Sequence, residues 1–177
     1  MSADQVADVL GTLATAGVLA VAAIIVLLVA APARLRSLRA GMSGSGTALA
    51  GAVAVVATGA SLWFSKGAHF PPCELCWYQR IAMYPLALVL PVAAWRNDRS
   101  IRPYAILLAA VGLAVSAWHN LIETFPSIDS GACDPTNPCT LRWVEGLGFW
   151  TIPRMAAVAF TLVLTVLLLD PPAPEAP

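Results

Sequence analysis

Two cysteines separated by two residues, Cys73 and Cys76, are the clearest candidates for chemistry in this sequence. Pro71 and Pro72 precede them and an apolar, helix-forming run follows, so the pair is predicted to lie in the first turn of a helix. A thiol at that position is near the positive end of the helix dipole and ionises more readily. Arg80 follows Cys76 by four residues, which puts a cation one turn further along the same helix face. This pattern predicts a redox-active dithiol.

A second pair, Cys133 and Cys139, lies in a segment rich in turn-forming residues. Four interpretations of the two pairs are open: structural disulfides, a four-cysteine zinc site, a redox relay, or coincidence. The spacing of Cys133 and Cys139 is wide for zinc ligands. Structural bonds closing such small loops would constrain the unfolded chain little, whereas a C-x-x-C disulfide exchanges readily. A redox relay without a metal ion is therefore favoured.

The composition indicates where these cysteines work. Of the 177 residues, 59% are hydrophobic and only 11% are charged, whereas soluble domains are typically about 25% charged. Such a chain cannot cover a soluble surface, so an integral membrane protein is predicted. The net charge is zero and no basic patch is present, so nucleic acid is not expected as a partner.

Five stretches are candidates for membrane-spanning helices, which need about 20 residues. They cover residues 9–33, 47–65, 77–95, 103–122 and 149–169. The first could be a signal peptide, but Asp4 and Asp8 precede it and Arg34 follows it, the reverse of the usual polarity, so it is expected to be retained. Pro85 and Pro91 are expected to bend the third span.

The predicted fold is therefore all-α: a four-helix transmembrane bundle over residues 47–170 plus one extra N-terminal transmembrane helix. Residues 1–46 comprise that helix and a basic, Gly/Ser-rich connection, which is expected to be a flexible linker. Residues 141–145 are expected to form a short interfacial helix. Residues 171–177 are expected to be a disordered tail.

Basic residues predict the orientation in the membrane. One side carries six: Arg34, Arg36, Arg39, Arg96, Arg99 and Arg102. The other carries four: Lys66, Arg80, Arg142 and Arg154. The side richer in arginine is predicted to be cytoplasmic, which puts both cysteine pairs outside the cytoplasmic membrane, where thiols are oxidised.

Residues 73–80 (CELCWYQR), the four spans from residue 47 onward and the cysteine pair in the next outer loop together resemble the DsbB family of disulfide bond formation proteins. The short C-x5-C loop followed by residues 148–153 (GFWTIP) is most similar to the BdbC-type branch of that family. The resemblance covers about residues 47–169 and leaves the first span outside it.

The resemblance implies a membrane enzyme in which quinone (ubiquinone or menaquinone) oxidises the first pair, the first pair oxidises the second, and the second oxidises a DsbA-like partner with the thioredoxin fold. By position, Cys76 would face the quinone and Cys73 would exchange with the loop pair. Cys139 would link the two pairs and Cys133 would meet the partner. Arg80 matches the family arginine associated with quinone.

Three further residues are candidate quinone contacts: Trp77, His119 and Arg154. Each has another interpretation. Trp77 could belong to an interfacial aromatic belt, and Arg154 could extend its charge to the interface. His119 could form a local hydrogen bond, with Glu123 one turn further to orient it.

Two other functions remain open. A vitamin K epoxide reductase-like quinone enzyme is also a four-helix dithiol bundle, but its C-x-x-C lies toward the end of the chain. A non-enzymatic membrane scaffold would keep both cysteine pairs as structural disulfides that never exchange with a partner.

Overall fold

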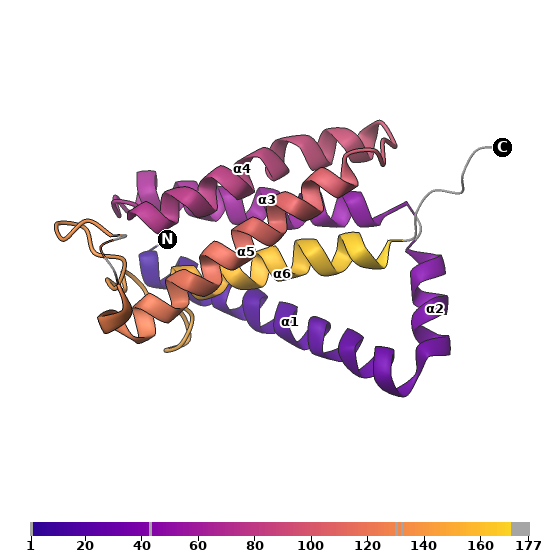
Figure 1. The fold of residues 1–177 in the computed structure, drawn as a ribbon, viewed down its shortest axis with the longest axis horizontal. Coiled ribbons are helices and arrows are strands. Elements are labelled where there is room, and N and C mark those ends of the chain that lie inside the picture. Colours follow the sequence, from indigo (N-terminus) through magenta and orange to yellow (C-terminus); the bar gives the residue numbers. More distant parts are fainter. Residues whose placement is uncertain (1, 43, 130, 132, 171–177) are drawn as a thin grey trace.

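The computed structural model describes residues 2–42, 44–129, 131 and 133–170, and within them the chain is mainly helical (Figure 1). The α-helices are α1 (Ala3–Ala30), α2 (Pro32–Gly41), α3 (Gly46–Leu62), α4 (Glu74–Trp95), α5 (Arg102–Thr124) and α6 (Ile152–Leu169). A π-helical turn, η1 (Trp63–Gly67), extends α3, and a 3-10 turn, η2 (Pro126–Ile128), follows α5. The predicted all-α class is confirmed. The predicted tail, 171–177, lies outside the described residues.

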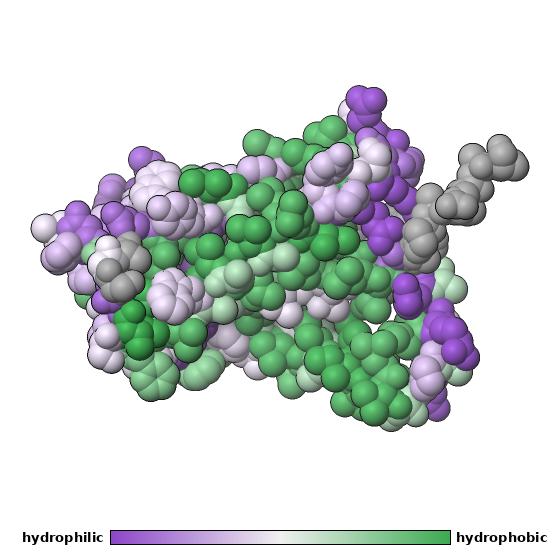
Figure 2. All heavy atoms as spheres, viewed as in Figure 1, coloured by the Kyte–Doolittle hydropathy of each residue, from purple (hydrophilic) through white to green (hydrophobic). Residues whose placement is uncertain are grey.

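Among the described residues, four helical stretches have the length and hydropathy to cross a membrane: α1, α3 with η1, α5 and α6. Figure 2 shows that apolar residues cover the middle of the face in view, while hydrophilic residues gather at its two ends. Five spans were predicted. The remaining predicted span corresponds to α4, which has 22 residues but is not among these four stretches; it includes Gln79, Arg80 and two prolines. It packs against both α3 and α5, inside the multi-pass bundle.

Helices α3, α4, α5 and α6 form a ring in which each packs against its two neighbours. The core contains Leu90 of α4 and three residues of α6, Phe160, Val163 and Leu167, all of which are fully buried. Gly112 of α5 allows this packing, because a Cβ at that position would overlap the ring of Phe160. Close approach at small residues is the usual basis of helix packing in membranes.

Helix α1 packs outside this ring, against α6, through a stripe of small residues. Its buried residues are Ala7, Gly11, Ala14 and Gly17. A Cβ on Gly11 would lie 2.9 Å from Cδ1 of Trp150, and one on Gly17 would lie 2.8 Å from a methyl group of Leu162. In Figure 1, α1 lies beside α6 at its N-terminal end and diverges from it toward α2.

The prediction of a flexible linker after the first span is wrong for most of that segment. The basic residues form α2, which begins with a proline in its first turn and buries Leu35. The Nε of Arg39 donates a hydrogen bond to the carbonyl of Leu169 over 3.0 Å. A cation at the C-terminus of α6 is favourable because that end carries negative partial charge.

The prediction of an interfacial helix over residues 141–145 is also wrong, because these residues form no helix. Trp143 instead stacks on Phe70, with ring centroids 4.9 Å apart. The Nε of Arg142 lies 3.2 Å from Oε1 of Glu123 in α5. These contacts with distant segments replace the local hydrogen bonds of a helix.

Candidate active site

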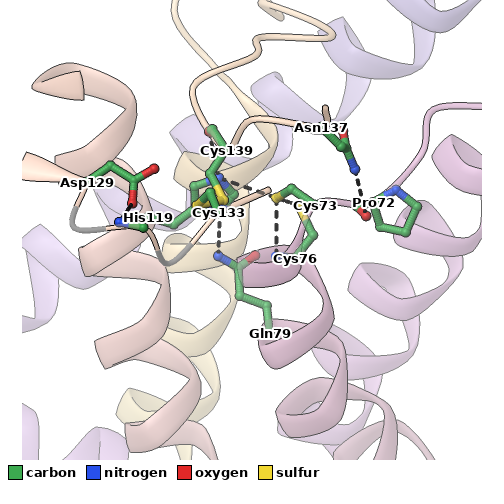
Figure 3. Close-up of a disulfide and its surroundings, with 10 residues drawn as sticks. Pro72, Cys73, Cys76, Gln79, His119, Asp129, Cys133, Asn137 and Cys139 are labelled. Atoms are coloured by element: carbon green, nitrogen blue, oxygen red, sulfur yellow. Dashed lines mark hydrogen bonds between the residues drawn. A yellow bond between two sulfur atoms is a disulfide. The ribbon is translucent and has the colours of Figure 1, made fainter. Parts of the chain in front are cut away.

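The C-x-x-C pair lies at the N-terminus of α4, as its sequence predicted (Figure 3). Cys73 is the N-cap residue, and its Sγ accepts a hydrogen bond from the backbone N–H of Cys76 over 3.4 Å. The two sulfur atoms are 2.7 Å apart. Cys73 is buried, whereas Cys76 is partly exposed. The two thiols therefore share one helix end but have different surroundings.

The loop pair lies directly beside it. Cys133 and Cys139 form a disulfide, with Cα atoms 5.8 Å apart. Both pack in one buried cluster with Cys73 and Ile122. The side-chain amide of Asn137, inside the loop, donates to the carbonyl of Pro72 over 3.1 Å (Figure 3). This bond ties the loop to the residue that precedes the C-x-x-C pair.

His119 of α5 joins the two cysteine pairs. Its Nε2 lies 3.0 Å from the carbonyl oxygen of Cys139 and 3.8 Å from Sγ of Cys73. Its Nδ1 lies 3.1 Å from Nε2 of Gln79, which can only donate. The neutral tautomer with hydrogen on Nε2 satisfies these contacts. Three potential metal ligands lie within 4.8 Å of one another here: Sγ of Cys73, a ring nitrogen of His119 and Sγ of Cys139. Cys139 is bonded to Cys133, however, and so is not a free thiolate that could bind a metal ion.

The environment of Cys73 favours the thiolate. A hydrogen bond from the Cys76 thiol, aided by His119 and the backbone N–H of Cys76, lowers the pKa of Cys73 to about 5. Burial opposes this shift, because desolvation disfavours the charged form. A thiolate is the form that attacks a disulfide and the better leaving group when one is broken.

A large apolar cavity lies next to Cys76. Its volume is about 400 Å³, and its walls come mainly from α1, α3, α4 and α6. Most of the lining side chains are aliphatic or aromatic, and the polar side chains among them are Ser61, Gln79, Arg80 and Tyr84. The cavity is thus apolar for most of its length, with a small polar region that includes one cysteine.

Arg80 is fixed at the wall of this cavity. Its Nε donates to Oγ of Ser61 over 3.0 Å, and its NH2 donates to the carbonyl oxygen of Ser61 over 3.2 Å. The hydroxyls of Ser61 and Tyr84 lie 3.3 Å apart. The guanidinium also lies over the ring of Trp77, 5.2 Å from its centroid. A two-pronged contact of this kind needs the planar fork of arginine.

Comparison with known proteins shows which family contains this chain. The family model for "Disulfide bond formation protein DsbB" matches residues 43–169. The chain belongs to the DsbB family. The match covers all four cysteines and every helix of the ring, while α1 and α2 precede it. No solved structure matches the chain.

Similar proteins from Bacillus and Oceanobacillus correspond to the expected BdbC-type branch. The chain is 39% identical over 118 residues to "Disulfide bond formation protein C" of Bacillus subtilis, covering 66% of this chain and 86% of that protein. It is 37% identical over 123 residues to "Probable disulfide formation protein C 2" of Bacillus anthracis, covering 70% and 88%. It is 41% identical over 118 residues to "Probable disulfide formation protein" of Oceanobacillus iheyensis, covering 66% and 81%.

Of the four residues predicted to contact quinone, Arg80 lines the large cavity and Trp77, His119 and Arg154 do not. Trp77 is 53% exposed and lies beneath Arg80. His119 lines a separate cavity of about 20 Å³, which also borders both thiols of the C-x-x-C pair. Arg154 donates to the carbonyl of Phe149 over 2.6 Å and covers its ring. Quinone contact by these three residues stays a prediction.

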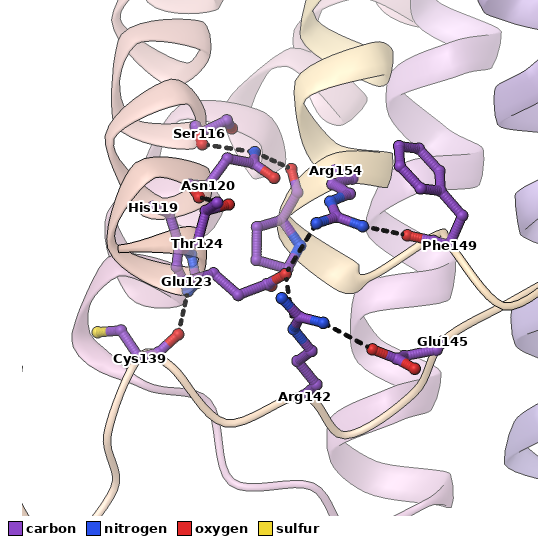
Figure 4. Close-up of polar contacts among 11 residues, drawn as sticks. Ser116, His119, Asn120, Glu123, Thr124, Cys139, Arg142, Glu145, Phe149 and Arg154 are labelled. Atoms are coloured by element: carbon purple, nitrogen blue, oxygen red, sulfur yellow. Dashed lines mark hydrogen bonds and ion pairs between the residues drawn. The ribbon is translucent and has the colours of Figure 1, made fainter. Parts of the chain in front are cut away.

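Glu123 was expected to orient His119, but its carboxylate lies against two arginines instead (Figure 4). Its carboxylate is 1% exposed and lies 3.2 Å from Arg142 and 3.7 Å from Arg154. The pair of arginines neutralises a charge that would otherwise be costly to bury. Glu123 thereby connects α5 to the loop before α6 and to the first turn of α6.

Three residues of the site were missed in the sequence. Gln79 lies three residues after Cys76, and Tyr84 lies four residues after Arg80. Residues at these spacings share a helix face, so both could have been predicted to lie beside the cysteine and the arginine. Ser61 is a polar residue within an otherwise apolar span, a pattern that often marks function in a membrane helix. Its pairing with Arg80 depends on the packing of α3 on α4, which the local sequence does not encode.

Proposed function

We propose that this DsbB-family protein oxidises the dithiol of an extracytoplasmic thioredoxin-fold protein and passes the electrons to membrane quinone. The observation that carries the proposal is the division between the two C-x-x-C sulfurs. Sγ of Cys73 lies within 4.8 Å of Sγ of Cys139, whereas Cys76 lines the large apolar cavity. One thiol thus contacts the protein disulfide and the other contacts a space suited to an apolar oxidant.

The protein steps are thiol–disulfide exchanges. A thiolate of the partner attacks Cys133 and forms a mixed disulfide, and Cys139 leaves as a thiolate. The second partner thiol breaks that mixed disulfide, so the partner is oxidised and the loop pair is reduced. Cys139 then attacks Cys73 of an oxidised C-x-x-C pair and releases Cys76. Attack by Cys133 on Cys139 releases Cys73 and restores the loop disulfide.

After these steps the loop pair is oxidised and the C-x-x-C pair is a dithiol, which is the arrangement of the four cysteines described above. The low pKa of Cys73, about 5, supports its role as the leaving thiolate when Cys133 reclaims Cys139. His119 holds the Cys139 carbonyl within 3.0 Å and so keeps the loop sulfur near Cys73 during the exchange. The two pairs are close enough to exchange without a rearrangement of the helices.

The cavity fits a quinone, because it offers an apolar volume for a tail and a small polar region beside Cys76. A quinone bound there would accept two electrons and two protons as the dithiol becomes a disulfide. Arg80 would supply a fixed positive charge where negative charge develops, in a region of low dielectric constant. Ubiquinone and menaquinone share this chemistry.

The arrangement of charges supports an extracytoplasmic site. Helix α2 and the turn between α4 and α5 lie at one end of the bundle and the cysteines at the other (Figure 1). The first end contains six of the ten basic residues, which favours a cytoplasmic position. A DsbA-like partner would then meet Cys133 on the oxidising side of the cytoplasmic membrane.

The proposal is tested with purified protein, a quinone and a reduced thioredoxin-fold protein. We expect quinone-dependent oxidation of the partner and its loss in Cys76→Ser. Trp95→Phe, a change at an exposed residue at the far end of α4, is the control and should retain activity. Turnover by Cys76→Ser at the wild-type rate would overturn the mechanism. Cysteine pairs that never exchange with a partner or respond to quinone would instead favour a scaffold.

A further inference from the structure

One wall of the apolar cavity comes from a helix that precedes the DsbB match. The match begins at residue 43, whereas Leu10, Leu13 and Ala14 of α1 line the cavity. The other walls come mainly from α3, α4 and α6, which belong to the matched ring. Because α1 packs outside that ring, the space between α3 and α6 would face lipid without it. Helix α1 therefore converts a lateral groove into a lined cavity.

The N-terminal half of α1 is fixed in this position by polar contacts to the loop before α6. A carboxylate oxygen of Asp8 accepts from the backbone N–H of Leu147 over 2.8 Å. The indole N–H of Trp150 donates to the hydroxyl of Thr15 over 2.9 Å. A Cβ on Gly146 would overlap the backbone of α1, so the loop and the helix are in close contact. These contacts flank the cavity-lining residues of α1.

The two halves of α1 differ in their surroundings. The lining residues lie in the half that is tied to the loop, and Ala14 there is 6% exposed. Leu13 also lines the cavity and is 53% exposed, so its side chain is only partly packed against neighbouring helices. In the other half, residues such as Val29, which is 83% exposed, face outward. The contacts with the loop thus hold the cavity-lining half of α1 in a defined position relative to Cys76 and Arg80.

We propose that α1 is the lateral wall of the quinone site and that Leu13 and Ala14 contact the isoprenoid tail, so that α1 sets the affinity for tailed quinones. The inference rests on the proposed function. A phospholipid acyl chain shares the apolar chemistry of the tail. The isoprenoid tail is favoured because Cys76 and Arg80 line the same cavity and give the ligand a redox-active, charged end.

The test compares variants of the full-length protein in detergent. Ala14→Leu adds side-chain volume to the cavity, and Leu13→Ala removes a side chain that lines it. Ala16→Leu and Leu19→Ala make the same changes at exposed α1 residues that do not line it. Dissociation constants are measured by quenching of tryptophan fluorescence with two probes: a naphthoquinone carrying two isoprene units and the same ring without a tail.

We expect both cavity variants to bind the tailed quinone about tenfold more weakly, because small changes of volume in an apolar pocket have effects of about that size. Binding of the tail-less ring should change less than twofold, and so should binding of either probe to the control variants. If Ala14→Leu fails to fold, Leu13→Ala decides the question. Equal affinities for the tailed quinone in Leu13→Ala and Leu19→Ala would overturn the role of α1.

The outcomes separate this inference from the proposed function. If the wild-type protein binds and reduces neither probe, the proposed function fails. If it reduces both while the cavity variants match their controls, the function stands and the α1 inference falls. Extraction of the purified wild type and Leu13→Ala gives a second readout. Co-purifying quinone that is lost in Leu13→Ala supports the inference, whereas phospholipid alone in both contradicts it.

Discussion

The lowered pKa of Cys73 predicts that this thiol reacts as a thiolate at neutral pH. A hydrogen bond from Cys76 and the proximity of His119 lower the pKa of Cys73 from about 9 to about 5. At pH 7 a thiol with a pKa of about 5 is roughly 99% thiolate, whereas one with a pKa of about 9 is roughly 1%. The reactive fraction therefore differs by about a hundredfold at neutral pH. Because the pKa is lowered, the thiolate persists above pH 5 and is lost as the pH falls through 5.

The assay is alkylation of Cys73 by iodoacetamide, followed by mass spectrometry of its peptide. The double variant Cys133→Ser/Cys139→Ser, kept reduced, confines the chemistry to the C-x-x-C pair. We expect the rate to reach its plateau above about pH 6 and to fall with a midpoint near 5. Adding Cys76→Ala removes the largest cause of the shift and should raise the midpoint toward 9. A midpoint above 8 before that change would show that neither Cys76 nor His119 stabilises the Cys73 thiolate.

Three further predictions concern the cavity, the buried carboxylate and the bundle. Arg80→Lys should raise the KM for quinone about tenfold, since lysine cannot reproduce the two-pronged contact with α3; steady-state kinetics measures this. Glu123→Gln should lower the free energy of unfolding by about 3 kcal/mol, because it leaves two arginines without their buried partner; thermal unfolding in detergent measures this. Gly112→Ala should destabilise by about 2 kcal/mol through overlap with an aromatic ring of α6, in the same assay.

Matched changes serve as controls for these variants. Glu145→Gln removes a carboxylate that is 47% exposed and also pairs with Arg142, and its effect should stay below about 1 kcal/mol. Gly59→Ala puts a methyl group where no atom of the described residues lies within 4 Å, and it should stabilise the helix by about 0.5 kcal/mol. A similar loss of stability in Gly59→Ala and Gly112→Ala would contradict the packing described for α5 and α6.

The sequence was sufficient to predict those features of the site that depend on neighbouring residues. Two prolines followed by a helix-forming run placed Cys73 at the start of α4, and helical spacing placed Arg80 on the cavity side with Cys76. These features depend on contacts within a few residues. The low charge content likewise indicated a helical membrane protein, because only internally bonded backbone is stable in lipid.

Features that depend on distant contacts were missed or assigned wrongly. The small residues of α1 are visible in the sequence, but their partners, Trp150 and Leu162, are more than a hundred residues away. Residues 141–145 were predicted to form an interfacial helix, yet Trp143 stacks on Phe70 and the segment forms no helix. Glu123 is spaced to meet His119 one turn away, but two arginines from the following loop and α6 provide stronger partners for its charge.

The relay between the two cysteine pairs is tested most directly by trapping its intermediate in Cys133→Ser. In this variant Cys139 has no loop partner, so quinone should oxidise the C-x-x-C pair and Cys139 should then attack it. Mass spectrometry after blocking of free thiols should find a Cys73–Cys139 disulfide that forms only when quinone is added. A Cys76–Cys139 bond, or no bond between loop and helix, would contradict the relay.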